Sequence, residues 1–321
     1  MSYKKIISSL LVLSTAHFYG DEEIASIEQN FTLERIPSSL DSVEGVDISL
    51  PALSTQKKST FLSVGLSGLF PGLGHAYLGD YTTASALMGS SGVGYGLAQF
   101  TFFEPYLEGD MLALSTVWSY GVYSAYRDVR AYNGGSSYLY KMPQDSFVDL
   151  AWAPFQVSVL KKPEVWGGIL GALTLGSIIS TLAFPQSEEL HIHMSPNTYP
   201  PVYAFPVSIG EESLFRGFLQ STIAESYGPW TGIILSSIAF GAAHIPNAQL
   251  LEKEDQMRYY TYILPYLSSM GAYLGWLTYK NQSLKESVAI HAWYDFAIFL
   301  GSSIASSAAI GKPNFSLSVS F

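Results

Sequence analysis

Cysteine is absent from this chain of 321 residues. Its absence excludes disulfide bonds, catalysis by a thiol and a lipid anchor on a cysteine. Charged side chains are also scarce, since only 13% of the residues are Asp, Glu, Lys or Arg. No stripe of basic residues is present, so we expect no nucleic-acid partner.

Apolar residues are correspondingly abundant, with 48% hydrophobic and 14% aromatic residues. Several apolar runs reach the length of about 20 residues that a helix needs to cross a bilayer. The length alone would also allow two soluble domains. The composition instead predicts an all-α, polytopic helical membrane protein, with the lipid bilayer as its first partner.

The N-terminal residues 1–20 are typical of a signal peptide. Lys4 and Lys5 precede a short apolar stretch, and small residues follow it. An uncleaved anchor is the alternative, which the shortness of the apolar stretch makes less favourable. Residues 21–58 are polar, and we predict an extended extracytoplasmic segment or a linker there.

A small glycine-rich membrane domain with three spans is predicted for residues 59–133. The stretch Pro71-Gly-Leu-Gly-His-Ala-Tyr-Leu-Gly79 predicts a tight turn between two closely packed helices. It resembles the P-G-x-G-Q-x-Y-x-G signature of a group of small bacterial membrane domains, a resemblance that implies architecture but no chemistry. His75 stands where that signature has Gln, and we interpret it as a hydrogen-bonding group between helices. The first two spans could also be re-entrant.

The rest of the chain divides into three parts. Residues 134–163 contain glycines and prolines and predict a linker that lies in the membrane interface. Five further spans are predicted for a second membrane domain in residues 164–311. Residues 312–321 are predicted to be a tail.

The positive-inside rule predicts the orientation of the spans. Basic residues gather between residues 127 and 162 and again at Lys280 and Lys285, which we expect in the cytoplasm. The loop 188–199 and the acidic residues 252–255 then fall outside. This alternation supports about eight spans after the signal peptide, in the inner membrane of a bacterium.

Ionisable residues interrupt three apolar segments of the second membrane domain. In the first, Glu212 and Arg216 are four residues apart, so on a helix they lie on one face and can pair. Glu211 faces another direction and has no local cation, which makes it a candidate general base. Charge at membrane depth is costly and normally marks a functional site.

The other two segments each carry a pair of residues at the same spacing of four. Phe240 and His244 form one pair, and His291 and Asp295 form the other. Three helices could thus bring two glutamates, two histidines and an aspartate into one cavity. A polar cluster that only holds helices together is the alternative. Because each ionisable group carries a cost of desolvation, we favour a functional site.

The three segments resemble the CAAX prenyl endopeptidase and bacteriocin-processing family of intramembrane proteases. That family has E-E-x-x-x-R, F-x-x-x-H and H-x-x-x-N on successive helices, and the resemblance here covers residues 166–311. Asp295 is a departure, because the family most often has Asn there. The resemblance implies an intramembrane endopeptidase whose substrate is a membrane-associated peptide or protein. In a bacterium it implies cleavage of peptides near or within the membrane.

The resemblance and the chemistry of hydrolysis together imply a role for each residue. Glu211 would be the general base, and His244 would share the water and deliver a proton. Glu212 and Arg216 would form a supporting pair. His291 would donate to the oxyanion.

Asp295 admits two roles. It is protonated in the apolar site, or it accepts from His291 and orients that ring, and we prefer the second role.

We expect no cofactor, but other functions stay open. Two histidines with carboxylates could bind zinc, although no H-E-x-x-H motif is present. Carboxylates and histidines also serve as proton relays, which leaves a proton-coupled transporter as an alternative. The change at Asp295 leaves a third alternative, a catalytically inactive scaffold that binds peptides or lipids.

Overall fold

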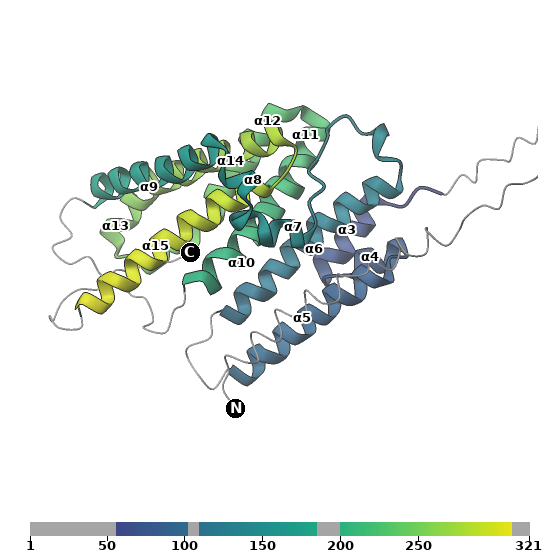
Figure 1. Ribbon diagram of the computed structural model, residues 1–321, viewed down its shortest axis with the longest axis horizontal. Helices are drawn as coiled ribbons and strands as arrows, with labels where there is room; N and C mark the ends of the chain where they lie inside the picture. The colour runs from purple at the N-terminus through teal and green to yellow at the C-terminus, as the bar shows by residue number, and fades with distance from the viewer. Residues whose placement is uncertain (1–55, 102–108, 185–199, 310–321) are drawn as a thin grey trace, which may run out of the picture. The chain divides into compact units, whose positions relative to one another are not determined.

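The computed structural model describes residues 56–101, 109–184 and 200–309. Within these ranges all regular secondary structure is helical, so the predicted all-α class is confirmed (Figure 1). The predicted signal peptide, nearly all of the segment 21–58, the whole loop 188–199 and the tail lie outside the described residues. The described residues from Lys58 onward belong to one compact unit.

The helices have the following bounds, in chain order. They are α3 (Thr60–Leu69), α4 (Leu73–Leu78), α5 (Tyr81–Thr101), α6 (Gly109–Tyr132), η1 (Gly135–Ser137), α7 (Phe147–Trp152), η2 (Ala153–Phe155), α8 (Val157–Leu160), α9 (Pro163–Ala183), α10 (Pro200–Glu212), η3 (Ser213–Gln220), α11 (Ser221–Tyr227), α12 (Pro229–Ala243), η4 (Ile245–Leu250), α13 (Lys253–Arg258), η5 (Tyr259–Ile263), α14 (Leu264–Asn281) and α15 (Lys285–Ala309). The segments η3 and η5 are π-helices, and the other η segments are 3₁₀ helices.

Two short helices, α3 and α4, stand where the first span was expected. They have 10 and 6 residues, fewer than the roughly 20 that a span requires. In the turn between them Gly72 has φ of 93°, and a Cβ there would lie 2.5 Å from the carbonyl oxygen of Ala84. Lys58, just before α3, donates from Nζ to the carbonyl of Tyr77 near the end of α4, at 3.1 Å. The two ends of the hairpin formed by α3 and α4 therefore lie close together. This geometry fits the re-entrant alternative.

One described helix, α9, is long and apolar enough to cross a membrane by composition alone. The long helices α14 and α15 contain polar and charged residues that lower their hydropathy, whereas α10 and α12 have only 13 and 15 residues. The predicted number of eight spans is therefore unconfirmed.

The two predicted membrane domains share a hydrophobic core. Tyr120, Tyr123 and Tyr126 of α6 are buried in one cluster with Ile209 of α10 and Val288 of α15. Helix α6 therefore packs against the helices that carry the first and third motifs. The boundary at residues 134–163 stays a sequence-based prediction.

The linker between the domains is anchored at the start of α15. The carboxylate of Asp145 accepts from the backbone N–H of Leu284 at 2.7 Å and from the hydroxyl of Ser283 at 2.9 Å. Asp145 thereby satisfies a backbone donor at the helix N-terminus, where donors otherwise lack partners. Exposed side chains of Trp152 and Phe155 in the same linker fit its predicted place in the interface.

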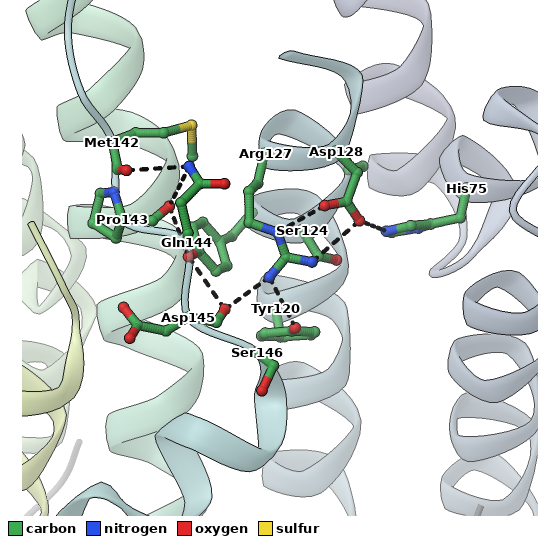
Figure 2. A network of polar contacts seen from close by, with 12 residues as sticks. His75, Tyr120, Ser124, Arg127, Asp128, Met142, Pro143, Gln144, Asp145 and Ser146 are labelled. Atoms are coloured by element: carbon green, nitrogen blue, oxygen red, sulfur yellow. Dashed lines mark hydrogen bonds and ion pairs between the residues drawn. The ribbon is translucent and has the colours of Figure 1, made fainter. Parts of the chain in front are cut away.

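A network of polar contacts joins the hairpin, α6 and the linker (Figure 2). His75 is fully buried, and its Nε2 lies 3.3 Å from a carboxylate oxygen of Asp128. Arg127 contacts Asp128 at 2.7 Å and donates to the carbonyl of Asp145 at 2.7 Å. His75 thus lies between α4 and α6 as expected, but its contact with Asp128 is an ion pair without hydrogen-bond geometry, so the expected hydrogen bond is not present among the described residues.

Candidate active site

The first motif lies where the α-helix changes into a π-helix. Glu211 and Glu212 end α10, and the π-helix η3 begins at Ser213 and carries Arg216. The wider turn of a π-helix changes the direction of the side chains that follow, and such segments occur frequently at functional sites. Spacing alone had predicted an uninterrupted helix here.

Glu212 holds the centre of the site. Its Oε1 accepts from Arg216 Nη1 at 2.9 Å and from His291 Nδ1 at 2.9 Å. The side chains of Glu212 and Arg216 are fully buried, and that of His291 is 9% exposed. The predicted pair of Glu212 with Arg216 is present, whereas the bond to His291, which comes from another helix, was not expected.

The second ring nitrogen of His291 faces two carboxylates. Nε2 lies 3.3 Å from Oδ2 of Asp295 and 3.8 Å from Oε2 of Glu211. The contact with Asp295 is an ion pair but lacks hydrogen-bond geometry, since Oδ2 of Asp295 has no hydrogen-bond partner among the described residues. The orientation of His291 therefore rests on Glu212 more than on Asp295, a difference from the preferred sequence-based role.

Phe240 joins the three motifs. Its ring centroid lies 4.9 Å from that of His244 and 6.0 Å from that of His291. The guanidinium carbon of Arg216 lies 4.3 Å from the same ring, within the range of a cation–π interaction. The aromatic residue of the second motif thus contacts one residue from each motif.

His244 ends α12 with a backbone conformation of φ −90° and ψ 0°, a sparsely populated region in which many active-site residues lie. Its Nδ1 lies 2.8 Å from the carbonyl oxygen of Phe240 and donates to it. Nε2 is then the nitrogen that can accept a proton. The hydroxyl of Tyr259 donates to the carbonyl of His244 at 3.3 Å, a contact that no sequence motif signalled.

The two adjacent glutamates differ in their access to solvent. The side chain of Glu211 is 30% exposed, whereas that of Glu212 is fully buried and has two hydrogen-bond donors as partners. Although Oε2 of Glu211 is itself buried, Glu211 is the more accessible of the two side chains. The structure brings Glu211, Asp295 and His291 into direct contact, and it joins His244 to them through Phe240.

The described residues offer no group of three or more histidines and carboxylates arranged to hold a metal ion. Nδ1 of His291 is bonded to Glu212, and Nδ1 of His244 is bonded to a carbonyl. Any metal at this site would have to use the remaining Nε2 atoms.

Comparison with curated proteins and comparison with solved structures each gave no match. A family model described as Type II CAAX prenyl endopeptidase Rce1-like matches residues 197–297. This range is less than half of the chain, but it contains all three motifs. The bacterial signature in the N-terminal domain has no such support and stays a prediction. The segment 197–297 is therefore similar to the type II CAAX prenyl endopeptidases, which confirms the resemblance stated for the C-terminal half.

Proposed function

We propose that this chain is an intramembrane endopeptidase of the CAAX-protease type, which cleaves a membrane-associated peptide or protein by means of an activated water. One observation carries the proposal. Glu211, partly exposed, lies 3.8 Å from the ring of His291, which a buried carboxylate holds in place. The match of the family model supports this reading, and it favours neither the transporter nor the inactive scaffold.

The charges of the site explain why Glu211 is the base. Glu212 is paired with Arg216, and Asp295 lies 3.3 Å from His291. If His291 is an imidazolium, these two pairs are each neutral. The cluster then keeps one net negative charge, which we assign to Glu211, and Glu211 takes a proton from water.

The protonation of His291 follows from its bonds. A carboxylate only accepts, so Nδ1 carries the hydrogen that is donated to Glu212. Nε2 also carries a hydrogen only in the imidazolium, which the facing carboxylates of Asp295 and Glu211 favour. That N–H is the donor available to the oxyanion that forms when water attacks the peptide carbonyl.

His244 completes the reaction. Its Nε2 accepts a hydrogen bond from the attacking water, because Nδ1 is held by the carbonyl of Phe240. Breakdown of the tetrahedral intermediate requires a proton for the leaving amine. Glu211, which has taken the proton from water, supplies it, and His244 assists the transfer. Asp295 keeps His291 charged, a reason for aspartate at this position.

The test is cleavage of a peptide library by the purified protein in detergent or lipid. Wild type should cleave, and Glu211→Gln should lose a factor of about 1,000 in kcat, within the usual range for a general base. Glu254→Gln, an exposed glutamate of α13, is the matched control and should stay fully active. Absence of cleavage by the wild type, or equal cleavage by Glu211→Gln, would contradict the proposal.

A further inference from the structure

Helix α6 runs alongside α10 and η3, which together carry the first motif (Figure 1). Near the start of α6, the hydroxyl of Thr116 donates to the carbonyl of Pro206 at 2.7 Å. Near its end, Arg130 pairs with Glu225 at 3.1 Å. In the second contact both residues lie later in the chain than in the first. Helix α6 therefore runs parallel to the segment 206–225.

Two glycines allow this close approach. A Cβ on Gly210 would lie 3.0 Å from the Cα of Thr116, and a Cβ on Gly217 would collide with the ring of Tyr123, 2.9 Å from its Cε2. Gly210 and Gly217 are seven residues apart, and so are Thr116 and Tyr123. On the α-helix α6 a spacing of seven returns to the same face after two turns, and both glycines lie against that face, so the two contacts form one continuous seam.

The ring of Tyr123 is fixed from several sides. Its side chain is fully buried, and its hydroxyl donates to the carbonyl of Pro143 at 3.1 Å. The guanidinium of Arg127 lies 5.6 Å from the ring centroid and also donates to the carbonyl of Asp145. Because these contacts hold the ring, a side chain at residue 217 could not push it aside without a loss elsewhere.

The two contacts of the seam lie on either side of the first motif in the sequence. Gly210 directly precedes Glu211 and Glu212, and Gly217 directly follows Arg216. A displacement of the helix at either glycine would therefore move these three side chains relative to His291, which comes from α15. The turns between the two contacts are π-helical, a rare conformation that occurs frequently at functional sites.

We propose that α6 is the element that positions the catalytic helix, with Tyr123 as a positioning residue that acts through Gly217. The inference rests on the proposed endopeptidase activity, and Tyr123 itself touches no reacting group. A misplacement of about 1 Å at a catalytic group can reduce the rate about 100-fold, so a small steric change at this seam has a large effect on turnover.

The first experiment measures kcat and KM of Gly217→Ala. We expect kcat to fall about 100-fold while KM changes little, because the substrate still binds but the carboxylates are misplaced. Removal of the obstructing ring should relieve the clash. The double variant Gly217→Ala/Tyr123→Ala should therefore regain at least about tenfold over Gly217→Ala, even though Tyr123→Ala alone lowers stability.

Gly74→Ala is the matched control for general destabilisation. A Cβ at Gly74 would collide with the carbonyl oxygen of Ser63, which lies between α3 and α4 and not between α6 and the segment that carries the first motif. Its melting temperature should fall while kcat of the folded fraction stays near that of the wild type. An equal loss of kcat in Gly74→Ala and Gly217→Ala at matched stability, or no rescue by Tyr123→Ala, would overturn the positioning role.

The second experiment tests the seam without reference to activity. The chain has no cysteine, so Thr116→Cys/Gly210→Cys is the only thiol pair in that variant. A Cβ at residue 210 lies 3.5 Å from the Cβ of Thr116, within the range of a disulfide. Oxidation should cross-link this pair but not Thr116→Cys/Gly171→Cys, since no atom outside its own helix lies within 4 Å of a Cβ at residue 171.

The outcomes separate this proposal from the proposed function. No cross-link, or a fully active Gly217→Ala beside an inactive Glu211→Gln, would overturn the positioning role alone. A wild type that cleaves no peptide although the cross-link forms would overturn the endopeptidase and, with it, the catalytic part of this proposal.

Discussion

Nδ1 of His291 donates to Oε1 of Glu212 at 2.9 Å, so the second glutamate of the first motif orients the histidine of the third. The same oxygen accepts from Arg216. Glu212 is thus a fully buried carboxylate with two hydrogen-bond partners, whereas the side chain of Glu211 beside it is 30% exposed. Adjacent glutamates with different surroundings should respond differently to substitution.

Glu212→Gln should destabilise the fold. The loss of its charge leaves Arg216 buried without a counter-ion, and breaking a buried pair in this way costs about 3 kcal/mol of unfolding free energy. Glu211→Gln should change stability by less than about 1 kcal/mol, since Glu211 makes no comparable bond. Denaturant unfolding of both variants in one detergent measures the difference. Equal stabilities would show that Glu212 does not support the site.

Asp295→Asn should lower kcat about tenfold, which corresponds to about 1.4 kcal/mol of transition-state stabilisation. The substitution removes the charge that faces His291, but Glu212 keeps the ring in place. Asp295→Ala should therefore fall within about tenfold of Asp295→Asn. Steady-state kinetics at matched expression test this. If kcat of Asp295→Ala is more than about 100-fold lower than that of Asp295→Asn, Asp295 and not Glu212 orients the ring of His291.

Proteolysis should persist in the presence of strong chelators such as EDTA and phenanthroline. The reason is the assignment of water activation to Glu211 and His244 and not to a metal-bound water. The measurement is the rate of peptide cleavage before and after chelation, with added zinc as the recovery step. Loss of activity that zinc restores would establish the metalloprotease alternative.

Residues at the start of α3 and just after α6 should lie on one side of the membrane. The backbone N–H of Lys58 donates to the side chain of Asn133 at 2.8 Å, and the amide of Asn133 donates back to the carbonyl of Lys58. With three complete spans in between, these residues would be on opposite sides.

The topology test uses the natural absence of cysteine. Ser59→Cys and Ser137→Cys introduce single thiols at exposed positions near these two ends. A reagent that cannot cross the membrane should label both from the cytoplasmic side. Labelling from opposite sides would restore the arrangement with eight spans and a segment 21–58 outside the cell.

The sequence predicted what depends on neighbours along one helix. The all-α class follows from long apolar runs, and the pair of Glu212 with Arg216 follows from a spacing of four. The same spacing placed His291 beside Asp295. Motif order alone sufficed to select all six candidate residues of the site.

Tertiary packing decided the rest. Glu212 and His291 are 79 residues apart, and Lys58 and Asn133 are 75 apart, so their contacts depend on how separate helices pack. The glycine-rich stretch 71–79 predicted a tight turn, but no local pattern indicates that Gly217 lies against Tyr123. Spacing within a helix determines which side chains share a face, and only the packing of helices determines what that face meets.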